Sequence, residues 1–462
     1  MFGPRLDLLS SSSFAEGEER EMQSLSMRST RAQSPGLPYW SLFSEALKNL
    51  HSKENEKGVV AMVVAENSLS AADVADRLKE VSSVALCTPG QMGYDDMRGR
   101  SSLRRSFQIV AEKFITSGAP VSPFNLCVGN GCGTLIQHLA HLLCDPSDCM
   151  LLATPTYGML YNDVGVLAGV EVIDVPLIAG SCLSTEALDE ACNRATARGL
   201  RPRLLFVINP ENPLGIVRGR EEMKSVLSWV RTKPDIHLVS DEIYALSVYD
   251  EEEGEPFKSM ASICYEESRG TSSIDVYLGD RVHILWGFSK DFCASGLRVG
   301  VLFSHNVSLL GALDNVGYFS AASNHTQDTL ALALVGGEVS GSYHSLTWLE
   351  GYLARNRARL REARDLVMFS LAKLRVGMIK PRAGLFIWID LSPWLTESTW
   401  AGERAFTQKL FQEGVLLTPG EAAHAASPGF FRLCFAWHSS IESISVGIKR
   451  LVNFLEKIRE RK

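Results

Sequence analysis

The chain has 462 residues, of which 45% are hydrophobic and 21% charged, and its formal net charge is −7. These values are typical of a globular protein with one large domain and a smaller one. We expect no nucleic-acid binding, because such proteins are usually basic, and no membrane segment, because every apolar run is too short to span a bilayer. Ten cysteines occur without CxxC pairs or metal-ligand spacing, which indicates reduced thiols and no metal site.

The first forty residues differ from the rest in composition. The stretch from Leu9 to Gly36 is rich in serine and charge and poor in bulky apolar residues, which indicates a disordered arm over residues 1–40. Its arginines also occur in transit peptides, but the glutamates between Glu16 and Glu21 argue against one, because transit peptides are poor in acids. We therefore expect a cytoplasmic protein.

From about residue 102, helical and strand-like patterns alternate. Residues 103–114, 134–143 and 221–232 have helical periodicity, and residues 347–374 predict a long helix. Short apolar runs predict strands at residues 124–129, 150–155, 170–177, 203–210, 237–244 and 282–290. This alternation is typical of an α/β fold with a mainly parallel sheet covered on both faces. Strand-like runs at 384–391 and 430–437 predict a smaller C-terminal α+β domain after the long helix.

Polar motifs follow the ends of these strands. They are GNGCGT (129–134), TPTYG (154–158), NPENPLG (209–215), SDEIY (240–244) and SK (289–290). Each has an ordinary explanation when taken alone, such as a turn or a surface cap. Because the carboxyl ends of parallel strands meet at one edge, where open α/β sheets bind ligands, we expect these motifs to converge on one site.

Together these motifs resemble the fold type I pyridoxal-phosphate enzymes, specifically the class I aminotransferases and their 1-aminocyclopropane-1-carboxylate synthase-like branch. The resemblance also rests on GFSKDFCASGLRVG (287–300), FFRLCFA (430–436), AEN (65–67) and the stretch from Tyr94 to Gly99. It covers about residue 55 to the C-terminus. It implies an aminotransferase-like fold, with a seven-stranded, mainly parallel sheet in the large domain.

The resemblance also implies the domain boundaries. Residues 41–100 are expected to pack on the small domain and the dimer interface. Residues 101–340 are expected to form the large cofactor-binding domain, and residues 341–462 the bridging helix and the small domain.

The cofactor implied is pyridoxal 5'-phosphate. Lys290 would form an imine with its aldehyde, since a buried lysine has a lowered pKa, and the released amine could move the Cα proton. Asp241 would keep the pyridine nitrogen protonated, which the ring needs to act as an electron sink. Tyr244 and Asn212 would bond the phenolic oxygen, and Tyr157 would stack on the ring.

The phosphate needs fixed donors. The resemblance assigns them to the backbone N–H groups of Cys132 and Gly133 at a helix start, and to the side chains of Ser289 and Arg298. Tyr94 matches a tyrosine that reaches the phosphate from the other subunit. The resemblance therefore implies a homodimer with shared sites.

Two residues are assigned to the amino-acid substrate. Arg432 would bind its α-carboxylate, which fixes the Cα bond that lies perpendicular to the ring and so selects the bond that breaks. Glu66 stands where the synthases have a glutamate near the substrate.

The phosphate site departs from the family pattern in two places. Gly287 stands two residues before Ser289, where the family often has a hydroxyl side chain. The phosphate loop reads GCG where many members have a small residue followed by Ser or Thr, and Thr134 is a candidate to compensate.

We expect a pyridoxal-phosphate enzyme of amino-acid metabolism or biosynthesis, and an aminotransferase in particular. Tyr94 lies five residues before Gly99, the usual aminotransferase spacing, whereas the synthases usually have a tyrosine before a His-Gly pair, where this chain has Met97-Arg98. The alternative is 1-aminocyclopropane-1-carboxylate synthesis or another α,γ- or β-elimination such as C–S cleavage. A non-catalytic relative and a nicotinamide dehydrogenase are less favoured, because Lys290 and Asp241 are present and the GxGxxG fingerprint is not.

Overall fold

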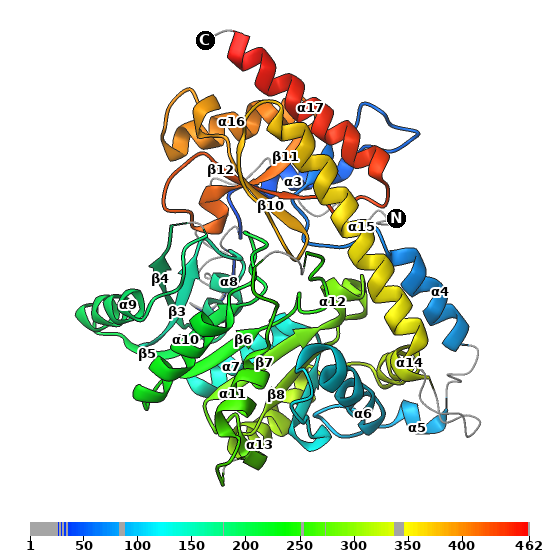
Figure 1. The fold of residues 1–462 in the computed structure, drawn as a ribbon, viewed down its shortest axis with the longest axis vertical. Helices are drawn as coiled ribbons and strands as arrows, with labels where there is room; N and C mark the ends of the chain where they lie inside the picture. The colour runs from blue at the N-terminus through cyan, green and yellow to red at the C-terminus, as the bar shows by residue number, and fades with distance from the viewer. Residues whose placement is uncertain are drawn as a thin grey trace.

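The computed structural model describes residues 36–460 except 83–87, 179, 251–253, 273 and 337–345, together with residues 26, 29, 32 and 33. The expected arm over residues 1–40 lies almost wholly outside the described residues, as does the boundary expected near residue 340. The domain boundaries therefore stay predictions. Two sheets organise the described chain, one of seven strands and one of five (Figure 1).

The seven-stranded sheet has the order β2-β8-β7-β6-β5-β3-β4. Its strands are β2 (Leu126–Gly129), β3 (Asp148–Thr154), β4 (Glu171–Pro176), β5 (Arg201–Ile208), β6 (His237–Asp241), β7 (Val282–Gly287) and β8 (Gly300–Ser304). Only β8 runs antiparallel to its neighbours, β2 and β7. The expected α/β fold with a mainly parallel seven-stranded sheet is therefore confirmed.

Helices cover both faces of this sheet, which explains why its strands are mainly apolar. Leu151 of β3 packs into one hydrophobic cluster, whereas its neighbours Met150 and Leu152 pack into another. The covering helices are α6 (Ser101–Val110), α7 (Cys132–Leu143), α8 (Leu160–Gly165), α9 (Thr185–Ala197), α10 (Arg220–Thr232), α11 (Met260–Ser268), α13 (Val307–Val316) and α14 (Asn324–Val335). Side chains alternate between the faces of a strand, so burial on both faces favours apolar residues at consecutive positions.

The five-stranded sheet joins the two ends of the chain. Its order is β1 (Val60–Met62), β11 (Val415–Pro419), β12 (Phe430–Cys434), β10 (Phe386–Asp390) and β9 (Gly377–Ile379). The N-terminal strand β1 pairs in parallel with β11. Helices α3 (Trp40–Lys48), α16 (Trp400–Gln412) and α17 (Ile441–Glu460) lie around this sheet (Figure 1).

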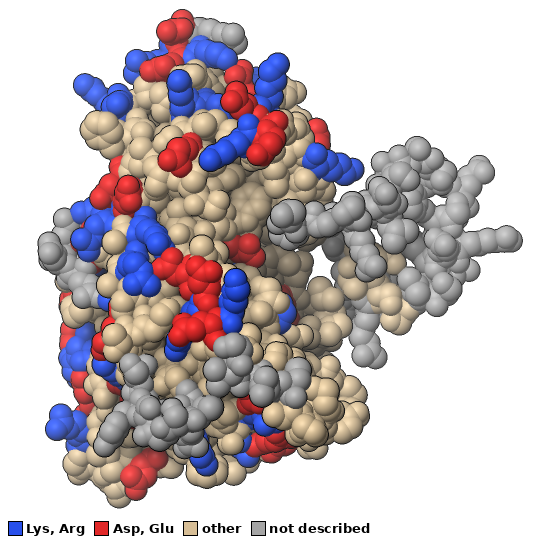
Figure 2. All heavy atoms as spheres, turned by 90° about the vertical axis from the view of Figure 1, so that its right-hand side faces the viewer, with Lys and Arg blue, Asp and Glu red and all other residues tan. Residues whose placement is uncertain are grey.

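A 26-residue helix, α15 (Thr347–Ala372), passes from the large sheet to the small one (Figure 1). Its first half, including Leu349 and Leu353, packs into the cluster of the large sheet, and its second half packs into a cluster that both sheets share. On the face shown in Figure 2, acidic and basic side chains are interspersed, and α4 (Ala71–Ser82) is tied to α15 by ion pairs from Asp73. No helix in the described ranges combines the length and apolar character needed to cross a membrane.

Candidate active site

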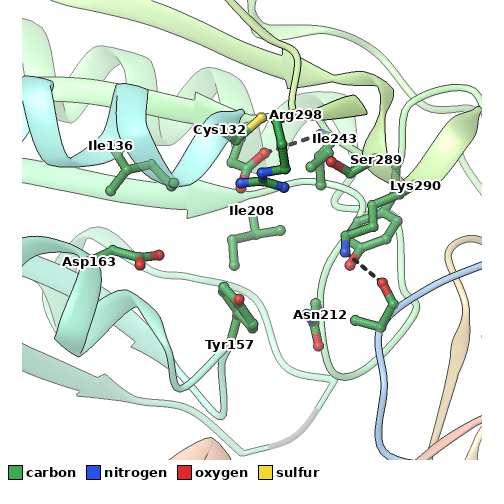
Figure 3. A pocket seen from close by; sticks show the side chains of 14 residues that line it. Cys132, Ile136, Tyr157, Asp163, Ile208, Asn212, Ile243, Ser289, Lys290 and Arg298 are labelled. Atoms are coloured by element: carbon green, nitrogen blue, oxygen red, sulfur yellow. Dashed lines mark hydrogen bonds between the residues drawn. The ribbon is translucent and has the colours of Figure 1, made fainter. Parts of the chain in front are cut away.

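A cavity of about 210 Å³ lies at the carboxyl ends of the parallel strands (Figure 3). Most of the predicted cofactor residues line it: Cys132, Gly133, Tyr157, Asn212, Asp241, Tyr244, Ser289, Lys290 and Arg298. They come from strand ends that are far apart in sequence. The expected convergence at one edge of the sheet is therefore seen, whereas the role of each residue stays a prediction.

Lys290 lies on α12 (Phe288–Asp291), the short helix that directly follows β7. Its Nζ donates a hydrogen bond of 2.5 Å to the carbonyl oxygen of Ala65 (Figure 3). Burial lowers the pKa of Lys290, and the negative charge of Glu66 opposes this shift. A lysine with a lowered pKa supplies more of the neutral amine that can attack an aldehyde. Glu66 is therefore near enough to act on this amine, although it does not line the cavity.

Two carboxyl groups face the cavity, and the sequence analysis identified only one. Asp241 ends β6, its Oδ1 accepts a hydrogen bond of 3.2 Å from the N–H of Ile243, and burial raises its pKa to about 7. Asp163 on α8 lines the same cavity, and burial raises its pKa to about 7 as well. The charge of Asp163 also raises the pKa of Asp241, whereas Lys290 lowers it. Asp163 belongs to no motif, and its approach to the cavity depends on how α8 packs against α7.

The predicted ring contacts come from three strand ends. Tyr157 lies between β3 and α8, and its side chain points into the cavity (Figure 3). Tyr244 is buried and packs edge-on against Phe386, with ring centroids 5.9 Å apart. Asn212 lines the same cavity. A flat ring could therefore meet both an aromatic face and polar side-chain atoms here.

Arg432 lies beside the cavity on β12 and is 5% exposed. Its Nη1 donates to Oδ1 of Asn212 at 3.0 Å, and its Nη2 donates to the carbonyl of Val63 at 2.6 Å and to Oγ1 of Thr418 at 3.2 Å. The guanidinium also packs over the Phe386 ring, 4.4 Å from its centroid. Among the described residues its buried Nε has no hydrogen-bond partner. This orphaned donor fits a carboxylate ligand, because a buried polar atom is rarely left unpaired.

The turn predicted to hold the phosphate has features that suit an anion, and its role stays a prediction. Helix α7 begins at Cys132 after Gly131, whose φ is 85°, and the first N–H groups of a helix have no acceptor within the helix. A Cβ atom on Gly131 would lie 2.6 Å from Nη2 of Arg298, so the bare backbone there makes room for the guanidinium. Thr134 donates its hydroxyl to the carbonyl of Asn130 at 2.9 Å. The compensation suggested for Thr134 is therefore not seen, because this hydrogen is already in use.

Tyr94 does not reach this cavity within one chain. It is 85% exposed, packs against Tyr318 in a tilted arrangement with ring centroids 5.8 Å apart, and lines a separate cavity of about 150 Å³. Its predicted role at the site of a neighbouring subunit therefore stays a prediction.

Known proteins resemble the chain over most of its length. Residues 50–450 match the family described as Aminotransferase class I and II. The chain is 32% identical to 1-aminocyclopropane-1-carboxylate synthase 4 of Oryza sativa subsp. japonica, over 92% of this chain and 88% of that protein. It is 30% identical to a Mus musculus protein named probable inactive 1-aminocyclopropane-1-carboxylate synthase-like protein 2, over 84% of this chain and 64% of that protein.

Solved structures share the fold at lower identity. A Thermus thermophilus aspartate aminotransferase mutant has a TM-score of 0.73 at 22% identity, covering 93% of this chain and 99% of that one. The aspartate aminotransferase of Rhizobium meliloti has a TM-score of 0.74 at 18% identity, covering 94% and 98%. These comparisons confirm the aminotransferase-like fold and, at the level of the family, the pyridoxal-phosphate cofactor. The chain therefore belongs to the class I and II aminotransferase family.

Proposed function

We propose that this chain is an active pyridoxal-phosphate enzyme that transaminates an α-amino acid. The observation that carries the proposal is the cavity itself, where a partly buried lysine amine and a carboxyl at a strand end face the same space as the start of helix α7. An arginine with a free, buried Nε lies beside it. Relatives named as probable inactive share about the same identity, so the support for activity comes from the residues present in this chain.

The bound cofactor would supply an aldehyde and a ring that withdraws electrons from the substrate Cα. Lys290 would hold that aldehyde and, once displaced, would move the proton at Cα. Asp241 in its ionised form would pair with the protonated ring nitrogen. Arg432 would bind the substrate carboxylate through Nε, the donor that protein atoms leave free. Asn212 would fix the guanidinium and meet the ring oxygen through its other amide atom.

A second candidate is 1-aminocyclopropane-1-carboxylate synthesis or a related elimination. The relatives with that name support it, and so does Glu66, whose charge acts on Lys290. The spacing of Tyr94 to Gly99 favours transamination over this reaction.

We also propose that the enzyme is a cytoplasmic homodimer. The exposed aromatic side chains Tyr94, Tyr318 and Phe319, which are 85%, 54% and 84% exposed, support the dimer as a surface that a second copy would cover. Cross-linking between Tyr94 of one copy and the cofactor site of another would test the shared site.

The deciding experiment is a spectral titration of the purified protein carrying pyridoxal phosphate. Single amino acids and then S-adenosylmethionine are added, and the products are identified. Conversion of the cofactor to its amine form together with a keto acid supports transamination. Release of aminocyclopropane carboxylate, ammonia or a thiol without this conversion supports the second candidate. Lys290→Ala should lose the covalent cofactor, whereas Lys113→Ala, which changes a half-exposed lysine in an ion pair with Glu350, should keep it.

A further inference from the structure

We propose that Cys132 and Gly287 form a matched pair that shapes the phosphate wall of the cavity, which is the side formed by Cys132, Gly133, Ser289 and Arg298. In this pair the sulfur of Cys132 occupies the space that a hydroxyl side chain at position 287 would need. Cys132 is thereby a positioning residue for the phosphate-bearing ligand through its side chain as well as its backbone. The inference rests on the proposed function and concerns the way in which that site holds the phosphate.

A row of three glycines brings the helix start close to the sheet. Gly129, Gly300 and Gly287 lie opposite one another in register across β2, β8 and β7. A Cβ atom on Gly300 would lie 2.7 Å from the backbone nitrogen of Cys132, and one on Gly129 would lie 2.8 Å from Cδ2 of Leu135. Real Cβ atoms do not approach other atoms this closely, so the first turn of α7 rests directly on bare backbone.

The sulfur of Cys132 fills the remaining space in this row. A Cβ atom on Gly287 would lie 2.7 Å from Sγ of Cys132 and 3.3 Å from the carbonyl oxygen of Val299. The sulfur is held in place, because it lies 3.3 Å from the carbonyl oxygen of Trp286 and its thiol can donate there. Cys132 is also 8% exposed, so the sulfur has little room to turn away. A side chain at 287 would therefore have to break this contact.

Neither member of this pair offers a side-chain hydrogen-bond donor to a bound phosphate. A thiol that donates to the Trp286 carbonyl has no second hydrogen for a phosphate oxygen, and burial keeps it un-ionised by raising its pKa. A glycine at 287 offers no side-chain donor either. The remaining donors are the N–H groups at the start of α7 and the side chains of Ser289 and Arg298. The thiol at 132 is therefore compatible with a glycine at 287, because a side chain there would clash with the sulfur in its present position.

The test is a double-mutant cycle on the full-length apoprotein. The variants are Gly287→Ser, Cys132→Ala and the double variant, with Gly296→Ser as a matched control, since a Cβ atom on Gly296 would meet nothing within 4 Å. The measurements are the thermal unfolding midpoint without cofactor and the dissociation constants for pyridoxal phosphate and for pyridoxal. Pyridoxal lacks the phosphate, so a comparison of the two dissociation constants distinguishes effects on the ring contacts from effects on the phosphate contacts.

In the native background, Gly287→Ser should weaken pyridoxal-phosphate binding by about tenfold or more and lower the unfolding midpoint, because overpacking a tight site displaces its walls. In the Cys132→Ala background, the same substitution should change the dissociation constant by less than about threefold, because the space is then free. If Gly287→Ser fails to fold alone, recovery of a folded, cofactor-binding double variant supports the pair equally.

Equal losses in the two backgrounds, or a Gly287→Ser protein that binds as tightly as the native one, would overturn the inference. Equal weakening for pyridoxal and pyridoxal phosphate would also overturn it, because the effect would then not lie at the phosphate. Failure of the native protein to bind pyridoxal phosphate at all would refute the proposed function instead. The two failures are therefore distinguishable.

Discussion

The loop that carries Asn212 is closed by a buried ion pair, and breaking that pair should strongly destabilise the protein. The side chain of Arg218 is 2% exposed and lies between Glu211, at 3.0 Å, and Glu222. Its backbone N–H also donates to Oδ1 of Asn209 at 2.9 Å. Arg218→Met would keep the apolar length but would leave the carboxylate of Glu211, which is 5% exposed, without its cation. Removing one partner of a buried pair costs about 3–5 kcal/mol.

The neighbouring Arg220 offers a matched control. It also pairs with two glutamates, Glu221 and Glu266, but its side chain is 38% exposed. Arg220→Met should therefore lower the free energy of unfolding by only about 0–1 kcal/mol, the usual range for exposed pairs. Urea unfolding of both variants, followed by tryptophan fluorescence, measures the difference. The comparison uses the first transition, because a chain with two sheets need not unfold in one step.

Lowering the pH gives an independent check on the same reasoning. In Arg218→Met the buried carboxyl of Glu211 can become neutral by taking up a proton, so the deficit relative to the native protein should shrink as the pH falls. A deficit that matches Arg220→Met within about 1 kcal/mol would show that the charge of Arg218 does not stabilise this loop.

Three further predictions concern other buried groups. Burial lowers the pKa of His283 to about 3 and that of His237 to about 4. Between about pH 6.5 and 4 only the unfolded chain binds these protons, so the free energy of unfolding should fall as the pH drops through this range. His283→Gln should reduce the slope of the unfolding free energy against pH by about one proton. Asp291 accepts hydrogen bonds from three buried donors, so Asp291→Ala should lower the unfolding free energy by about 3 kcal/mol or more. Urea unfolding should show a larger loss for Asp291→Ala than for Asp291→Asn. The charge of Asp163 raises the pKa of Asp241, so Asp163→Asn should lower that pKa. The pH below which pyridoxal-phosphate affinity is lost should then also be lower, which equilibrium dialysis across a pH series measures.

The large sheet could be predicted from sequence because its signals are local. Runs such as residues 203–210 are apolar at consecutive positions and end in a polar motif, which is the pattern of a strand buried on both faces. The strand β8 was not predicted, because its residues directly follow the Arg298 motif and were interpreted only for their chemistry. The hydrogen bond of Thr134 to the backbone was not predicted, and its reason is geometric. In the first turn of a helix its hydroxyl lies within reach of the carbonyl four residues earlier, and it donates there.

The small sheet carries less of this local signal: apolar runs predicted β10 and β12, but β1, β9 and β11 were not predicted. The pairing of β1 with β11 joins Val60 to Val415, and no periodicity in either segment indicates that the other is its neighbour. The expectation that residues 41–100 pack on the small domain came from the family resemblance alone. Asp163 shows the same limit on a smaller scale, because a short helix without a motif gives no indication of which side chain faces a cavity.

The segment after β1 contacts both Lys290 and Arg432, which the sequence alone did not predict. The carbonyl of Val63 accepts a hydrogen bond from Arg432, and the carbonyl of Ala65, two residues later, accepts one from Lys290. One short piece of backbone therefore accepts hydrogen bonds from both the Lys290 amine and the Arg432 guanidinium. If Lys290 bonds the cofactor as proposed, its Nζ would leave the Ala65 carbonyl, whereas the Val63 contact with Arg432 could persist. This backbone segment therefore helps to position both the proposed cofactor lysine and the proposed carboxylate-binding arginine.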